Sequence, residues 1–123
     1  MKIVKVVDVK FSEEKSDLFI GKVDRQPLTS DDITGVKRTN GSIVIGKNYF
    51  HPGARTKLHT HLCEQFLYIT EGKGTVGTDK EQYDVTAGTL VYIPAGELHF
   101  HGATEKTSMG HLSIVTVPYD TKF

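Results

Sequence analysis

The chain has one cysteine, Cys63, no tryptophan and no excess of charge of either sign. A single cysteine cannot form a disulfide within the chain, and it suits a reducing compartment. The 15 lysine and arginine residues balance the 15 aspartate and glutamate residues. Nothing in this balance favours a nucleic acid or an anionic membrane surface as a partner.

Long apolar runs are also missing. No segment approaches the roughly 20 consecutive apolar residues of a membrane-spanning helix. Lysine and aspartate interrupt the apolar residues of the opening segment, residues 1–14, so that the run is too short for the core of a signal peptide. We therefore expect a soluble, cytoplasmic protein. The 123 residues form one predicted domain, residues 1–123, which is long enough to bury a core without disulfides.

Helical periodicity is scarce, and at most residues 12–18 could form one helical turn. Short runs rich in Val, Ile, Thr, Tyr and Phe are separated by glycine, asparagine and aspartate, which is typical of β-strands and turns. Many short strands at this spacing indicate an all-β sandwich or small barrel. The polar segment 24–40 is predicted to be a long loop or arm. The predicted strands are residues 3–9, 19–23, 42–50, 56–61, 65–70, 74–77, 90–93, 98–101 and 111–117, with turns that include residues 71–72 and 109–110.

Histidines carry the main chemical signal. His59 and His61 are one residue apart, and alternate strand residues point to the same face. A third imidazole from a distant strand, His99, would complete a metal site, because three histidines and one oxygen donor are a common ligand set for divalent first-row metals. Gln65 is the predicted oxygen donor. Glu64 could replace it only if a bulge shifted the strand register.

The spacing of these residues extends over two segments. The first reads Gly53-x5-His59-x-His61-x3-Gln65-x6-Gly72, and the second reads Gly88-x5-Pro94-x-Gly96-x2-His99. Together they resemble the two sequence motifs of the cupin superfamily. Gln65 departs from the usual glutamate, and Ala103 departs from the usual asparagine. The resemblance implies a double-stranded β-helix, or jelly-roll, barrel with the metal inside. The motif core would span about residues 42–117, preceded by N-terminal strands and an arm in residues 1–41.

A narrower resemblance is carried by several short segments, among them residues 52–56, 94–97, 99–103 and 109–114. They look like a bacterial subfamily of small single-domain cupins. It contains manganese-dependent hydroxynitrile lyases and carboxymuconolactone-decarboxylase-associated cupins. Its members also have glutamine at position 65 and histidine at positions 101 and 111. The chain departs from it at residues 62–64, where Pro-x-Gly is usual. The resemblance implies one divalent transition metal, with manganese or iron favoured over nickel, zinc or copper.

Two further histidines are candidate catalytic residues. His101 follows His99 by two residues and faces the same interior if the strand continues, while His111 opens the last predicted strand. A neutral imidazole beside a metal can move protons near physiological pH. The neutral amide of Gln65 would leave the full double charge on the metal, which makes it a stronger Lewis acid.

Three functions remain open for a protein with this predicted site. The first is a metal-dependent enzyme of lyase or isomerase type, including hydroxynitrile lyase chemistry. The second is a metal-dependent dioxygenase, and the third is a non-catalytic module that binds a metal or a small molecule. Arg55 is either a ligand for an anionic substrate or a surface residue, and Cys63 is predicted to be an inert, partly buried thiol.

Alternation also predicts which side chains face the barrel interior. Asn48 and Val115 have the parity to line the pocket. A homodimer is expected, because jelly-roll domains of this size leave sheet edges and apolar faces to be covered. Residues 3–11 are the segment predicted to pair with, or cross to, a neighbouring copy. The large side chains predicted to lie in the core are Phe50, Phe66, Tyr68, Leu90 and Tyr92.

Overall fold

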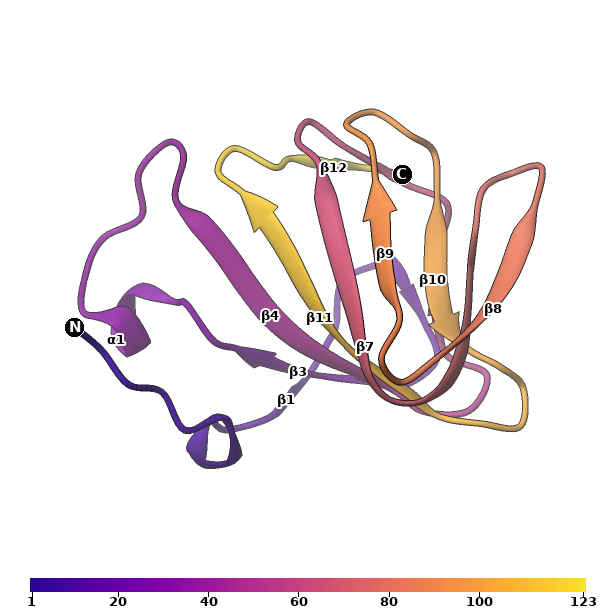
Figure 1. Ribbon diagram of the computed structural model, residues 1–123, viewed down its shortest axis with the longest axis horizontal. Coiled ribbons are helices and arrows are strands. Elements are labelled where there is room, and N and C mark those ends of the chain that lie inside the picture. Colours follow the sequence, from indigo (N-terminus) through magenta and orange to yellow (C-terminus); the bar gives the residue numbers. More distant parts are fainter.

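The computed structural model describes residues 1–123 as one antiparallel sheet that curls into a half-barrel (Figure 1). The strand order is β1-β3-β4-β11-β7-β10-β5-β2, with β8 and β9 also paired to β7, and β12 pairs separately with β6. The predicted all-β fold class is confirmed. No helix is long and apolar enough to cross a membrane. The strands are β1 Ser12–Glu13, β2 Phe19–Ile20, β3 Val23–Pro27, β4 Ile43–Phe50, β5 Arg55–Thr56, β6 Thr60–His61, β7 Gln65–Gly77, β8 Gln82–Thr86, β9 Leu90–Ile93, β10 Phe100–Ala103, β11 Met109–Thr116 and β12 Thr121–Lys122; the helices are the 3-10 helix η1 Val6–Asp8 and α1 Asp31–Thr34.

The long strand β7 connects the two halves of the half-barrel. Its first part pairs with β11 and β9, and its second part pairs with β10 and β8. At the bend Gly72 has φ +74°, and a Cβ there would overlap the carbonyl oxygen of Ser108, so only glycine fits. The β11–β7 register shifts by one residue between Gly110 and His111, which bends the strand as a β-bulge does. The turn predicted at residues 71–72 is therefore a bend inside one strand.

The N-terminal region differs from the sequence-based expectation. Residues 3–9, predicted as a strand, contain the 3-10 helix η1 instead. The amide of Gln26 donates hydrogen bonds to the carbonyl oxygens of Val6 and Val9, at 2.8 and 2.7 Å. A side chain thus satisfies backbone acceptors that a strand partner would otherwise satisfy. The segment lies against β3 and does not pair with the sheet as a strand.

Other boundaries also move. The predicted loop at residues 24–40 contains most of β3 and the short helix α1, and residues 12–18 begin with β1 and form no helix. Strand β8 was not predicted from the sequence. Four of its five residues are exposed, so its sequence shows no alternation of apolar and polar residues. Residues 109–110 belong to β11, although glycine suggested a turn there.

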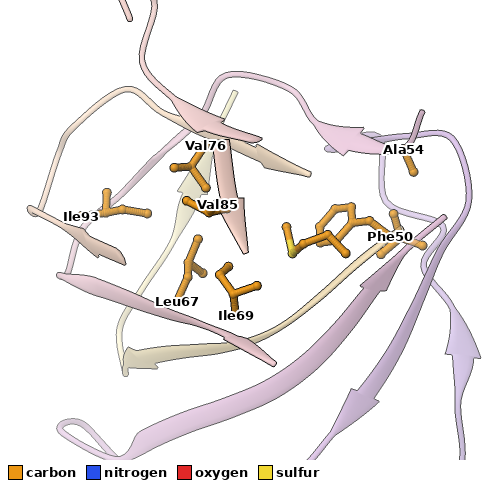
Figure 2. Close-up of a cluster of buried hydrophobic side chains, with 9 residues drawn as sticks. Phe50, Ala54, Leu67, Ile69, Val76, Val85 and Ile93 are labelled. Carbon is orange, nitrogen blue, oxygen red and sulfur yellow. The ribbon is translucent and has the colours of Figure 1, made fainter. Parts of the chain in front are cut away.

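The interior of the half-barrel is divided along its strands. From one end of β11 to the other, the inward side chains are Met109, His111, Ser113 and Val115, and their partners on β4 are Phe50, Asn48, Gly46 and Val44. One end of each strand therefore contributes to an apolar core, and the remainder lines a pocket with both polar and apolar walls. The core contains Val23, Phe50, Ala54, Leu67, Ile69, Val76, Val85, Ile93 and Met109 (Figure 2).

The outward side chains of the same strands form an apolar surface. Tyr68, Leu90 and Tyr92 were expected in the core but are 42%, 60% and 51% exposed. They alternate with the inward residues of β7 and β9 and so point away from the interior. Of the expected core residues Phe50 is fully buried and Phe66 is half-buried. We call this surface the outer apolar face; it comprises Ile43, Ile45, Phe66, Tyr68, Leu90, Tyr92, Leu112 and Ile114.

Candidate metal centre

A short backbone bridge brings the two histidine segments together. The N–H of His59 donates to the carbonyl oxygen of His99 at 2.9 Å, and the N–H of His99 donates to that of His59 at 3.0 Å. Directly paired residues in antiparallel strands place their side chains on the same face. The two imidazole rings accordingly lie with their centroids 4.1 Å apart.

His61 joins this pair from the same side. Its carbonyl oxygen accepts a hydrogen bond from the N–H of Gly96 at 2.9 Å, which ties the Pro94-Ala95-Gly96 turn to β6. The ligand nitrogens of His59, His61 and His99 all lie within 4.8 Å of one another, and no more than 9% of any of these residues is exposed. The structure therefore brings together the three histidines that the sequence predicted as metal ligands.

Hydrogen bonds fix the orientation of each ring. His59 Nδ1 lies 2.8 Å from the carbonyl oxygen of Lys57, and His99 Nδ1 lies 2.7 Å from that of Glu97. A carbonyl oxygen only accepts, so both Nδ1 atoms carry the hydrogen and both Nε2 atoms have a free lone pair. His61 Nδ1 lies 3.0 Å from the hydroxyl of Thr121.

The free nitrogens point to a common partner. His61 Nε2 is buried and has no hydrogen-bond partner in the chain. Metal-binding histidines commonly use one ring nitrogen for the metal and donate the other N–H to a carbonyl oxygen or similar acceptor. These three residues fit a divalent metal in that respect and could hold one.

Burial also keeps the three imidazoles neutral. It lowers the pKa of His59 to about 4, helped by the neighbouring His99. The pKa values of His61 and His99 are lowered from their ordinary value, again chiefly by burial. A metal would therefore not have to displace protons from these nitrogens at neutral pH.

Gln65 is buried beside the cluster. Its amide nitrogen donates to the hydroxyl of Ser113 at 2.8 Å, and its Oε1 lies 3.1 Å from Nε2 of His99. Because that Nε2 has no hydrogen, two acceptor atoms face the same space, where a cation would satisfy both. Glu64 is exposed instead, and its carboxylate accepts a hydrogen bond from the hydroxyl of Tyr92. Metal ligation by Gln65 remains a prediction, and its position next to the histidines agrees with it.

His101 and His111 form a second, buried pair. His111 Nε2 lies 2.9 Å from His101 Nδ1, and the backbone N–H of His101 donates to the hydroxyl of Thr56 at 3.1 Å. His101 Nε2 is buried without a partner in the chain. Burial lowers the pKa of His101 well below its ordinary value and that of His111 to about 4. Both rings are therefore neutral at physiological pH.

A pocket of about 200 Å³ opens onto these groups. Asn48 and Val115 line it, as alternation predicted, whereas His99 and His111 are not among its lining residues. The volume is below the roughly 300–1,000 Å³ of drug-sized ligand sites, so the pocket suits a small molecule. Its lining residues are Glu14, Ser16, Leu18, Phe19, Arg25, Val44, Gly46, Asn48, His59, His61, Gln65, His101, Ser113, Val115, Tyr119, Thr121 and Phe123.

Sequence reasoning missed several polar residues of this site, among them Ser113, Arg25 and Thr121. Ser113 has the same strand parity as His111, and Arg25 has that of the buried Val23, so both could have been found by alternation. Thr121 belongs to the two-residue strand β12 and gave no signal. Arg55 lies outside the pocket, with its guanidinium 5.8 Å from the ring centre of Phe100.

Removing two of the three histidines should abolish metal binding. We expect near-stoichiometric metal in the wild-type protein and almost none in His59→Ala/His61→Ala, since one histidine and an amide form a weak site. Plasma mass spectrometry on untagged protein measures this. His51→Ala is the matched control, because His51 pairs with Asp24 away from the cluster. Equal metal content in the double variant and the wild type would contradict the site.

The stability of the metal-free protein should depend on pH. Burial lowers the folded-state pKa values of His59 and His111 to about 4, from an ordinary value of 6.5. Between these values the unfolded chain binds protons that the folded chain does not, so the free energy of unfolding falls as the pH is lowered from 6.5 towards 4. A loss of roughly 1 to 3 kcal/mol per histidine is expected. Urea titrations of chelator-treated protein at pH 7 and pH 5 measure it, and equal free energies at both would contradict neutral, buried rings.

Comparison with known proteins agrees with this geometry. Residues 49–115 match the family model of the cupin domain. The chain is 33% identical over 116 residues to an (R)-mandelonitrile lyase of Granulicella tundricola, which covers 93% of this chain and 83% of that protein. A cupin-like protein from Thermotoga maritima superposes with a TM-score of 0.80 at 30% identity, covering 91% of this chain and 83% of that one. The polyketide cyclase RemF of Streptomyces resistomycificus has the same fold, with a TM-score of 0.84 at 21% identity over 99% of this chain and 84% of that one. The chain therefore belongs to the cupin family.

Proposed function

We propose that this cupin is a metal-dependent enzyme that cleaves or isomerises a small, hydroxyl-bearing molecule, with His101 as the proton carrier. One observation carries the proposal. His101 lines the pocket beside His59 and His61, and its Nε2 is buried without a partner while its Nδ1 is hydrogen-bonded to His111. A ring used only for structure would have no need of a free, buried nitrogen at a pocket wall.

His59, His61 and His99 would hold the metal through their Nε2 atoms, with the Gln65 oxygen as the fourth proposed ligand. When bound, a divalent metal supplies Lewis-acid polarisation of a substrate oxygen. Ser113 keeps the Gln65 oxygen turned towards the histidines. His59, His61, Gln65 and His101 are themselves buried, and burial strengthens electrostatic interactions among such groups.

The histidine pair supplies a route for one proton. A neutral His101 can accept a proton at Nε2 if its Nδ1–H donates to Nε2 of His111, and that hydrogen bond stabilises the resulting imidazolium. In a cyanohydrin, the hydroxyl proton would move to His101 Nε2 while the bond to the nitrile carbon breaks. The cyanide then takes the proton back, which gives a carbonyl compound and hydrogen cyanide. The similarity to an (R)-mandelonitrile lyase supports this version of the reaction.

Loss of His101 should separate catalysis from metal binding. We expect His101→Ala to keep its metal and to lose about 100- to 10,000-fold in kcat, the usual contribution of a general acid or base. Carbonyl release from a cyanohydrin panel, with manganese-loaded protein, measures turnover. His51→Ala again serves as the control. Unchanged turnover in His101→Ala would remove His101 from the mechanism.

Two other results would favour the alternatives. Oxygen consumption by iron-loaded protein with an enolic substrate would favour a dioxygenase. Full metal loading without turnover of any substrate tested would favour a non-catalytic binding module. Either result would overturn the proposed reaction without affecting the metal site.

We also propose that the protein is a homodimer joined through the outer apolar face. That face crosses β4, β11, β7 and β9, and register pairs Ile114 with both Ile45 and Phe66, and Phe66 with Tyr92. Four of its members, Ile43, Tyr68, Leu90 and Tyr92, are 42–60% exposed. Soluble monomers rarely leave a continuous apolar patch of this kind uncovered.

Charge on this face should dissociate the dimer. Light scattering at micromolar concentration should give twice the chain mass for the wild type and the single-chain mass for Leu90→Lys/Tyr92→Lys. Tyr83→Lys is a matched control, since Tyr83 is a similarly exposed tyrosine on β8 that also donates to a nearby glutamate, as Tyr92 does. A wild-type protein with the mass of one chain would contradict the proposal.

A further inference from the structure

The pocket contains one lysine or arginine side chain, that of Arg25. Arg25 lies on β3 two residues after the fully buried Val23, and it shares the inward parity of that residue. Its backbone is in register with Asn48, which lies next to His111 on the following strand. The strand therefore directs this cation towards the same interior as the histidines.

The absence of a side chain at Gly46 leaves room for the guanidinium of Arg25 in the pocket wall. A Cβ built on Gly46 would lie 3.2 Å from Nη2 of Arg25 and 3.5 Å from its Cζ and Nε. All three nearest atoms belong to the guanidinium. The group therefore lies against the inner surface of β4, in the space that a side chain at position 46 would occupy if this residue were not glycine. The Arg25 side chain is 36% exposed, which leaves it accessible from the pocket.

The donors of Arg25 are largely unused within the chain. Its nearest carboxylate, Glu14, lies 3.8 Å away, a distance beyond an ordinary hydrogen bond, and no other side chain or carbonyl accepts from it. A guanidinium carries five N–H donors in a planar fork that matches a carboxylate. The Glu14 carboxylate is the one acidic group in the lining, and it competes weakly for this cation.

The position of Arg25 also sets the length of a bound molecule. The guanidinium lies over Gly46 on β4, and the oxygen of Gln65 extends from β7, with β11 between them. Neighbouring strands are about 4.8 Å apart, so the two strands that carry these groups are two spacings, or about 10 Å, apart. A short hydroxy acid could place its hydroxyl at the histidines and its carboxylate on Arg25.

We propose that the substrate of this pocket is a small carboxylic acid with a hydroxyl or carbonyl oxygen, and that Arg25 binds its carboxylate. The inference rests on the proposed function, because the same pocket holds the reacting oxygen. It assigns to Arg25 the anion-binding role that the sequence suggested for Arg55.

Binding of 3-hydroxybutyrate and of its neutral amide to the manganese-loaded protein tests the proposal by isothermal titration calorimetry. We expect Arg25→Gln to weaken carboxylate binding about tenfold or more, as the loss of charge-assisted hydrogen bonds does, and to leave the amide within twofold. Glu14→Gln removes the competing carboxylate and should tighten carboxylate binding severalfold. Arg55→Gln is the matched control and should change neither ligand.

Two results would overturn the proposal. One is carboxylate binding in Arg25→Gln as tight as in the wild type, which would mean that the acid binds the metal alone. The other is an equal loss for the acid and the amide, which would mean that Arg25 only maintains the pocket wall. Both are read from binding and not from turnover. The proposed reaction could therefore fail while Arg25-dependent binding is observed, or succeed while such binding is absent.

Discussion

The pair of backbone hydrogen bonds between His59 and His99 is the constraint on which the site depends. It joins His59 and His99, which are 40 residues apart in the sequence. It also sets two imidazoles side by side and leaves their Nδ1 atoms next to the carbonyl oxygens of Lys57 and Glu97. The orientation of both Nε2 atoms follows from main-chain geometry, so it needs few additional side chains.

Single strands of the curled sheet contribute residues both to the apolar core and to the candidate site. Phe50 and Met109 pack at one end of β4 and β11, whereas the polar residues Asn48, His111 and Ser113 follow further along these strands. Buried polar atoms without partners are rare in folded proteins because each costs desolvation energy. Here several of them gather around the pocket: Asn48 Oδ1, His61 Nε2, His101 Nε2 and His111 Nδ1. Such a concentration of exceptions is expected where a ligand or metal completes the structure.

Strand alternation predicted the all-β fold class and the common face of His59 and His61, because it is a local signal. The resemblance to the two cupin motifs, and no local signal, placed His99 with them. Gln65 against Glu64 was also decided by parity, and the structure has Gln65 inside. The N-terminal region was not predictable in the same way. Residues 3–9 have the composition of a strand but contain a 3-10 helix. The side chain of Gln26, on the distant strand β3, donates hydrogen bonds to their backbone carbonyl oxygens. Arg25 was missed because residues 24–40 read as a polar loop, so the alternation from Val23 was not extended to it; the structure continues the strand to Pro27.

The outer apolar face shows the limit of composition as a guide to burial. Tyr68, Leu90 and Tyr92 look like core residues, and their parity relative to Leu67 and Ile93 puts them outside. Composition identified them as apolar, but only the register distinguishes the inner from the outer surface of a curled sheet. Their exposure is accounted for if a second copy covers them.

A crystal structure of the manganese-loaded protein, with an anomalous difference map, would test the central claim most directly. The metal site predicts one strong peak about 2.0–2.3 Å from Nε2 of His59, His61 and His99, near the range for imidazole and oxygen ligands, with the Gln65 oxygen turned towards it. No peak among these three histidines in metal-loaded protein, or a peak held by other residues, would contradict a metal centre at this position.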